Sequence, residues 1–347
     1  MTFFNIRLLD IVTGEEMALP HSSDSQVGFA LALGNFDGVH AAHRELINVT
    51  IDAAEKLCKS GKLIHPAAFF FRVPSGDFIS MAQSEHLTTL EEKLCLFRSC
   101  GLRYAFIADF PSLRNCDADA FMWEVLKDMC AAHAVCCGYN FRFGKNGTGT
   151  PEQLKNVFGE NCTILARQSA CLDSNECNET VTISSSTIRQ LLKNGNSCQA
   201  ACLLSYPYVI SGSVTYGKQL GRNLGFPTAN LAIPSEKLLP RCGVYASIVL
   251  VDGTAYYGVS NVGKRPTVDS PSVSVNCETH LLDFSNNLYG KQIYVFLLYH
   301  LRDEIAFPSI DVLQTTISND VQQAKFLLQT KQSSEFLRRA LDYFKFS

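Results

Sequence analysis

The segment Gly-Arg-Asn-Leu-Gly-Phe-Pro-Thr-Ala-Asn at residues 221–230 separates two parts of the chain that differ in pattern. Its glycines give the backbone freedom and room for a ligand, and Pro227 biases the residue before it toward an extended conformation. In an extended segment, Thr228 and Asn230 point to the same side and present two neutral oxygens. Such oxygens suit Mg2+ that also holds substrate phosphates, although an ordinary turn between strands explains the same residues.

The residues after this segment, together with Tyr208–Tyr216 before it, follow the two-residue period of β-strands. The further predicted strands are 243–251, 255–262, 273–283 and 292–300. Short strands with glycine corners predict a closed antiparallel β-barrel. Helical patterns at 309–328 and 333–344 predict two helices that close this domain.

The residues before the segment alternate between strand and helix patterns. The predicted strands are 27–33, 62–71, 104–108 and 134–137, and the predicted helices are 43–59, 89–100 and 118–132, the last capped by Asp117. This alternation predicts an α/β domain with a Rossmann-like parallel sheet and right-handed crossovers. Ligands of such sheets bind beyond the carboxyl ends of the strands.

Composition limits the class of protein. Of the 347 residues, 46% are hydrophobic and 18% are charged, which indicates a globular chain. The net charge of −3 argues against a nucleic-acid or anionic-membrane partner. The fourteen cysteines include no Cys-x-x-Cys pair, and neither a signal-peptide layout nor an apolar run of about 18 residues occurs. We therefore expect reduced thiols in a cytoplasmic protein.

The segment 221–230 resembles the signature of riboflavin kinases. Supporting segments follow in that family's order: 243–245, 261–267, 278–284, 288–290 and 301–304. The resemblance implies that Thr228 and Asn230 hold Mg2+ and nucleotide phosphate, and that Glu278 is the general base. From its alternating pattern alone, Glu278 could equally face solvent. Arg302 resembles a flavin-contacting arginine, and we expect Gly217 and Lys218 to cover the ATP as a flap.

Residues 34–43, Gly-Asn-Phe-Asp-Gly-Val-His-Ala-Ala-His, lie between a predicted strand and a helix. That arrangement aims backbone N–H groups and the helix dipole at an anion, and His40 and His43 share one helix face. An ordinary βα turn with surface histidines is the alternative.

The same stretch resembles the nucleotidyltransferase motif of FMN adenylyltransferases, with Ala42 in place of a glycine. By this resemblance, Gly34, Phe36, Asp37, His40 and His43 bind ATP. Residues 70–75 lack that family's Pro-His-Pro, which leaves Arg72 as the nearby cation.

Two further segments resemble adenylyltransferase elements. The loop 138–144 follows a predicted strand, and the resemblance places Asn140 near the flavin and nucleotide. A run of hydroxyl residues at 184–187 begins a helix, where helix capping is the simple explanation. The resemblance instead places Ser186 and Arg189 at the triphosphate.

The whole chain thus resembles the bacterial bifunctional riboflavin kinase/FMN adenylyltransferase family, also called prokaryotic FAD synthetases. The resemblance implies an FMN adenylyltransferase-like domain at 1–195, a linker at 196–206 and a riboflavin kinase domain at 207–347. It implies phosphorylation of riboflavin by ATP to FMN, then adenylylation of FMN by a second ATP to FAD with release of pyrophosphate. Mg2+ is the implied cofactor.

The implied partners are riboflavin, FMN, FAD and ATP, and the sequence leaves open whether the chain forms a homo-oligomer. Two alternatives remain. One is a riboflavin kinase with an impaired amino-terminal domain, suggested by Ala42 and the missing Pro-His-Pro. The other is a flavin-binding regulator on an enzyme scaffold, against which the presence of Thr228, Asn230 and Glu278 argues.

Overall fold

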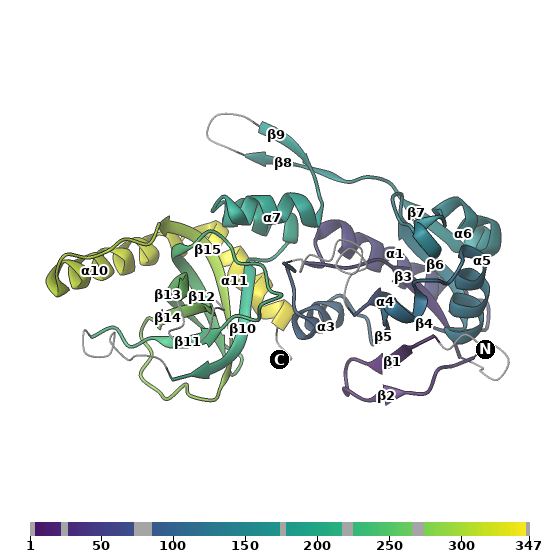
Figure 1. Cartoon of the computed structure of the whole chain (residues 1–347), viewed down its shortest axis with the longest axis horizontal. Coiled ribbons are helices and arrows are strands. Elements are labelled where there is room, and N and C mark those ends of the chain that lie inside the picture. Colours follow the sequence, from purple (N-terminus) through teal and green to yellow (C-terminus); the bar gives the residue numbers. More distant parts are fainter. Residues whose placement is uncertain are drawn as a thin grey trace. The chain divides into compact units, whose positions relative to one another are not determined.

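The computed structural model describes residues 4–21, 27–72, 85–173, 178–216, 225–265 and 274–344 (Figure 1). Residue contacts divide the chain into two compact units. The first unit comprises Met1–Ser84 and Lys93–Ser169, and the second comprises Glu85–Glu92 and Ala170–Ser347. Within the described ranges, no helix is long and apolar enough to cross a membrane.

A seven-stranded sheet with the order β2-β1-β5-β4-β3-β6-β7 forms the centre of the first unit. Its strands are β1 Ile6–Asp10, β2 Glu16–Met17, β3 Val27–Leu33, β4 Leu63–Phe71, β5 Tyr104–Ala108, β6 Ala132–Gly138 and β7 Cys162–Leu165. The five strands from β5 to β7 are parallel, as predicted, whereas β1 pairs antiparallel with β5 and β2 forms the edge beside β1. The carboxyl ends of β3, β4 and β6 therefore meet at one edge of the sheet.

Helices accompany this sheet because their apolar faces pack on it. They are α1 Ala41–Cys58, α3 Leu90–Ser99, α4 Phe110–Leu113, α5 Ala118–Ala120, the π-helix η1 Phe121–Met129, α6 Pro151–Phe158, and the short 3-10 turns η2 Lys145–Gly147 and η3 Gly159–Asn161. Asp117 caps α5 as predicted, accepting a hydrogen bond from the Ala120 N–H at 2.7 Å. The helix predicted to reach residue 132 ends at Met129, because Ala131 adopts a positive φ of 44° and turns the chain into β6.

The second unit contains the predicted closed barrel, in which neighbouring strands follow the order β10-β11-β14-β13-β12-β15 and all pairs are antiparallel. Its strands are β10 Tyr208–Thr215, β11 Ala229–Ala232, β12 Gly243–Val251, β13 Thr254–Arg265, β14 Ser274–Leu281 and β15 Gln292–Arg302. The helices are α7 Ser185–Lys193, α8 Ser197–Leu204, α10 Ile310–Leu328 and α11 Lys331–Phe344. A separate two-stranded ribbon joins β8 Ser169–Asp173 and β9 Asn178–Thr182 (Figure 1).

A buried ion pair anchors residues 85–92 in the second unit. The Lys237 ammonium contacts the Glu92 carboxylate, and their side chains are 1% and 0% exposed. Lys237 also donates to the Leu87 carbonyl at 2.7 Å, and Ser211 donates to the other Glu92 oxygen at 2.8 Å. Hydrogen bonds thus satisfy both charges, as a buried pair requires if it is to repay its desolvation cost.

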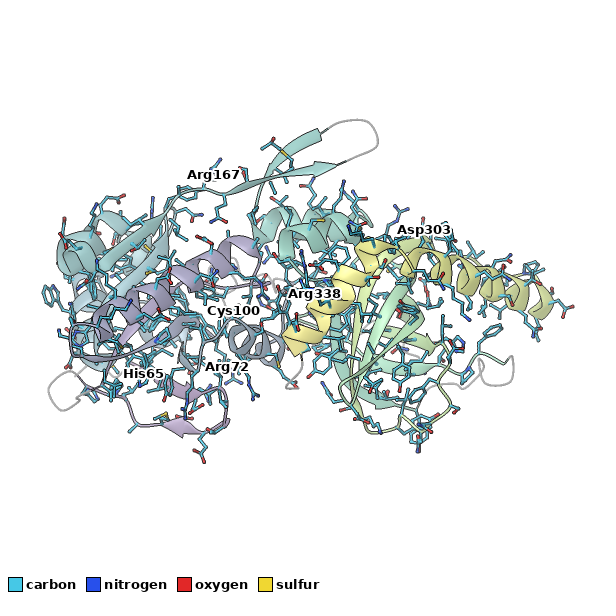
Figure 2. All side chains as sticks on the ribbon, turned by 180° about the vertical axis from the view of Figure 1, so that it is seen from behind. His65, Arg72, Cys100, Arg167, Asp303 and Arg338 are labelled. Carbon is cyan, nitrogen blue, oxygen red and sulfur yellow. The ribbon has the colours of Figure 1, made fainter. Side chains whose placement is uncertain are left out.

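Substitution Lys237→Met should destabilise the second unit, because it leaves the Glu92 carboxylate buried without its counter-charge. Removing one partner of a buried ion pair typically costs about 3–5 kcal/mol. Urea denaturation followed by circular dichroism measures the effect. The matched control is Arg338→Met on α11, whose guanidinium forms exposed ion pairs with Glu335 and Asp342 (Figure 2). A Lys237→Met midpoint equal to that of the control would contradict the prediction.

Candidate active sites

A cavity of about 250 Å3 lies between the barrel and α10 in the second unit. Its apolar lining consists of Phe226, Val244, Val259, Ile305, Phe307, Leu313 and Ile317. Its polar lining consists of Thr228, Asn261, Glu278, His280, Arg302, Glu304 and Asp320. Apolar walls with a few polar groups suit a flat organic ligand that a small number of hydrogen bonds orient.

Glu278 and Asn230 meet because β11 pairs with β14 in a register that places these two residues directly opposite each other. The Asn276 side chain connects them. Its amide nitrogen donates to the Asn230 amide oxygen at 3.1 Å and to a Glu278 carboxylate oxygen at 3.4 Å. Glu278 is half-buried and is one of the residues that line the cavity.

Sequence reasoning missed Asn276, although its signal was present. It lies two residues before Glu278 in a strand, so both side chains point to the same face. We define Asn230, Asn276 and Glu278 as the polar triad.

Thr228 lines the same cavity, and Asn230 lies two residues later with 6% of its surface exposed. Thr228 and Asn230 each offer one neutral side-chain oxygen, and the Glu278 carboxylate lies nearby. An all-oxygen donor set fits a hard divalent cation that completes its shell with water and phosphate oxygens. Gly217 and Lys218, and residues 221–224, lie outside the described residues, so the predicted flap is not described.

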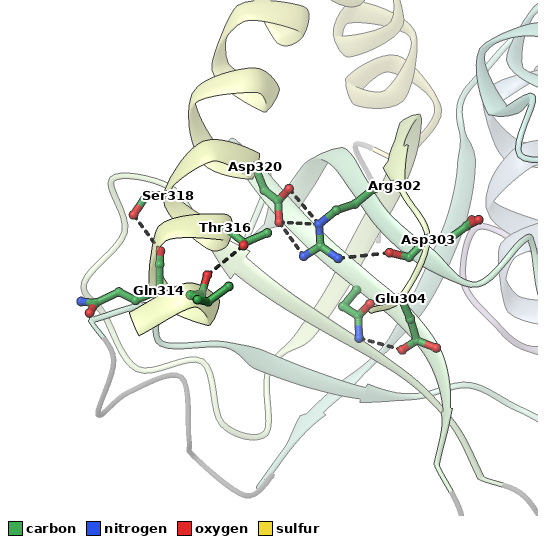
Figure 3. Close-up of polar contacts among 9 residues, drawn as sticks. Arg302, Asp303, Glu304, Gln314, Thr316, Ser318 and Asp320 are labelled. Atoms are coloured by element: carbon green, nitrogen blue, oxygen red, sulfur yellow. Dashed lines mark hydrogen bonds and ion pairs between the residues drawn. The ribbon is translucent and has the colours of Figure 1, made fainter. Parts of the chain in front are cut away.

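Arg302 ends β15 and is tied to α10. Its Nε and Nη2 atoms donate to the Asp320 carboxylate at 2.8–3.1 Å, and its Nη1 donates to the Asp303 carbonyl at 3.1 Å (Figure 3). The guanidinium also lies over the Phe307 ring, 5.6 Å from its centre. The side chains of Arg302 and Asp320 are 23% and 7% exposed. The bidentate contact therefore fixes the direction of Arg302 in the cavity wall, and Asp320 is a second residue that sequence reasoning missed.

In the first unit, the loop that joins β3 to α1 carries Gly34, Phe36, Asp37 and His40. Phe36 and Val39 adopt positive φ values of 51° and 38° while both side chains are fully buried. Positive φ strains residues other than glycine, so burial of these two side chains holds a conformation that the backbone alone disfavours. Phe36 packs edge-on against Phe97 of α3, with ring centres 5.2 Å apart.

His40 and His43 stack at the start of α1, with ring centres 3.7 Å apart. Burial lowers the pKa of His40 to about 4, although Asp37 opposes the shift. Burial, assisted by His40 and Lys93, lowers the pKa of His43 well below its usual value. Both imidazoles are therefore neutral near pH 7. Their Nδ1 atoms are buried and have no hydrogen-bond partner among the described residues.

The other residues that were predicted from the adenylyltransferase resemblance are exposed or half-buried. Asn140 is exposed in the loop after β6, and Arg72 is exposed after β4, where its N–H donates to the Ala108 carbonyl (Figure 2). Ala42 is half-buried in the first turn of α1.

The hydroxyl run before Arg189 does cap a helix, because the Ser184 side chain accepts a hydrogen bond from the Thr187 N–H at 3.2 Å. Ser186 is exposed in the same turn. Arg189 donates to the Glu85 carbonyl at 3.0 Å. Ser186 and Arg189 belong to the second unit and the histidine pair to the first. Their joint contact with a triphosphate stays a prediction.

Comparison with known proteins gives matches over both units. A riboflavin kinase family model matches residues 204–328, and a FAD synthetase family model matches residues 22–185. Bifunctional riboflavin kinase/FMN adenylyltransferases from Haemophilus influenzae and Escherichia coli K12 are 33% and 34% identical. These matches cover 86% and 88% of this chain and 94% of each relative.

A solved structure described as a macrolide-efflux protein from Streptococcus pneumoniae is 26% identical. It has a TM-score of 0.74, with 89% of this chain and 98% of that chain covered. Because relatives above 30% identity match along nearly their whole length, the chain belongs to the bifunctional riboflavin kinase/FMN adenylyltransferase family.

Proposed function

We propose that this chain phosphorylates riboflavin to FMN and then adenylylates FMN to FAD, with ATP as the donor in both reactions. The observation that best supports the kinase reaction is the polar triad at the edge of the cavity, inside the segment that the riboflavin kinase model matches. The adenylyltransferase reaction draws its support from the strained loop and stacked histidines at the start of α1, inside the segment that the FAD synthetase model matches.

In the kinase reaction, the isoalloxazine ring occupies the apolar part of the cavity and the ribityl chain reaches toward Glu278. The Glu278 carboxylate accepts the proton of the ribityl 5′-hydroxyl as that oxygen forms a bond to the γ-phosphorus of ATP. The bond from the γ-phosphorus to the bridging oxygen breaks, and ADP leaves. Asn276 holds the Glu278 carboxylate in place, and the half-buried position restricts water around it.

Enzymes of these ATP-using families generally need a divalent metal ion, and we propose Mg2+ for this chain. Thr228 and Asn230 would hold the ion together with phosphate oxygens, and the ion would supply counter-charge for phosphoryl transfer. The Asn276 amide nitrogen donates a hydrogen bond to the Asn230 amide oxygen, and this contact fixes the orientation of the Asn230 amide.

In the adenylyltransferase reaction, a phosphate oxygen of FMN attacks the α-phosphorus of ATP, and the bond to pyrophosphate breaks. The reaction needs no protein nucleophile, so the protein contributes position and charge. The start of α1 provides N–H groups and the positive end of the helix dipole. Neutral His40 and His43 act there as hydrogen-bonding groups rather than as cations. We place Ser186, Arg189 and Asn140 at the triphosphate and flavin as predicted contacts.

Product analysis of the full chain with riboflavin, ATP and Mg2+ tests the proposal. Formation of FMN followed by FAD supports both reactions. Formation of FMN alone, including when FMN is supplied as substrate, would leave only the kinase. If neither product forms, the chain is not an enzyme of this pair of reactions.

Substitution Glu278→Gln should lower the rate of FMN formation by about 100-fold or more, because the amide cannot accept the hydroxyl proton. Steady-state assays of FMN formation measure the loss, and fluorescence titration should show that riboflavin still binds. Glu335→Gln, at a half-buried position on α11, is the isosteric control. Near-normal turnover of Glu278→Gln would remove Glu278 from the role of base.

Substitution Thr228→Ala or Asn230→Ala should raise the Mg2+ and ATP concentrations that half-saturate FMN formation, because each removes one oxygen from the donor set. FAD formation from supplied FMN should remain unchanged in the same preparations, since the adenylyltransferase residues Gly34–His43 lie in the other unit. Loss of both reactions in a folded variant would contradict the assignment of separate sites.

Substitution Asp320→Asn should raise the KM for riboflavin roughly 10-fold, the lower end of the range for a lost charged hydrogen bond. The Arg302 guanidinium would lose its bidentate partner and its fixed direction in the cavity wall. The kcat should change less than the KM, because the polar triad is untouched. Asp311→Asn in the exposed first turn of α10 serves as the control. A riboflavin KM equal to that of the control would show that Asp320 does not position Arg302.

A further inference from the structure

Lys93 is a buried cation next to the loop Gly34–His43 of the first unit. It lies on α3, is only 5% exposed, and donates from Nζ to the Asn35 carbonyl at 3.0 Å. Its ammonium also lies 4.8 Å from the centre of the Phe70 ring on β4. A buried lysine is rare unless its charge serves a partner. Here the hydrogen-bonded partner is the backbone of the loop that leads to His40 and His43.

The loop needs such a contact because its backbone is strained. Asn35 directly precedes Phe36, which has a positive φ of 51°, and Val39 follows with a φ of 38°. Such conformations persist when surrounding structure enforces them. The Phe36 ring packs on Phe97, which lies one helical turn after Lys93 on α3. One helix therefore holds the loop twice, through a ring contact and through a charged hydrogen bond.

We propose that Lys93 positions the loop Gly34–His43 for the triphosphate of ATP during adenylyl transfer, an inference that rests on the proposed adenylyltransferase function. The ammonium fixes the Asn35 carbonyl and thereby the direction of the peptide groups that follow it. It also places a positive charge behind the loop, where it offsets the Asp37 carboxylate, which is only 4% exposed. Without this cation, a buried carboxylate beside the ATP site would repel the phosphates.

The charge of Lys93 depends on pH. Burial lowers the pKa of Lys93 to about 8, although Asp37 opposes the shift. The neighbouring titratable groups are Asp37 on the loop and the neutral imidazole of His43 on α1, which stacks on the neutral His40 at the end of the loop, whereas β4 contributes the apolar Phe70. On α3 itself, the Glu92 carboxylate is paired with Lys237. Lys93 is therefore protonated near pH 7 and loses its charge as the pH rises through about 8.

Substitution Lys93→Met in the full chain tests the inference, because methionine keeps the length and removes the charge. We expect kcat/KM for ATP in FAD formation to fall roughly 10- to 100-fold, the range for a lost charged hydrogen bond. FMN formation by the same protein should be unchanged. The matched control is Lys127→Met. Lys127 is half-buried, and its ammonium lies 4.1 Å from the centre of the Phe158 ring. Its replacement should leave both reactions near wild type.

The pH profile separates a charge effect from a purely structural one. In the wild type, kcat/KM for ATP should fall as the pH rises through about 8, since this ratio reports groups of the free enzyme. In Lys93→Met that fall should be absent. An unchanged kcat/KM, or a lowered value that keeps the wild-type pH dependence, overturns the inference.

If Lys93→Met does not fold, the wild-type profile decides, and a profile without the fall overturns the inference. A wild type that makes no FAD overturns the proposed adenylyltransferase function instead.

Discussion

The pairing of β11 with β14 is the constraint on which the kinase site depends. Closure of the barrel fixes their register, and the register places Asn230 opposite Glu278. A shift of one residue would turn both side chains to the other face. Asn276 then joins the two through its amide, so the proposed metal ligand Asn230, the linking amide and the proposed base Glu278 form one hydrogen-bonded unit. The barrel thus works as a rigid frame for groups that must meet within about an ångström.

Helix α10 completes this site from outside the barrel. Leu313 and Ile317 supply apolar wall, and Asp320 anchors Arg302. The same helix therefore provides both apolar surface of the cavity and the carboxylate that orients Arg302 in its wall.

In the first unit, a buried charged side chain and a strained backbone define the loop between β3 and α1. Its loop adopts two positive φ values at fully buried residues, and a buried lysine holds the carbonyl just before them. The stacked histidines are neutral because burial disfavours their charged forms and, at His40, outweighs the attraction of Asp37.

The sequence by itself determined the two architectures and the local motifs. Strand and helix periods reflect which faces are buried, so β3, β5 and β12 lie at the residues predicted for them, and the antiparallel barrel follows from its short strands and glycine corners. The roles expected for Thr228, Asn230 and Glu278 came from the resemblance of their segments to riboflavin kinases, because an ordinary turn explains the first two residues and the strand pattern alone allows Glu278 to face solvent. The cap at Asp117 was predictable because its chemistry is local.

Only the tertiary structure decided the contacts between distant segments. Asp320, Lys93 and the Glu92–Lys237 pair carry no local signal of their role, because their partners lie 18 to 145 residues away. The antiparallel pairing of β1 with β5 and the neighbours of the Glu278 side chain likewise depend on which strands lie side by side. The period of a sequence pattern indicates whether a side chain is buried. Strand register and packing determine which residues that side chain contacts, and both depend on the whole fold.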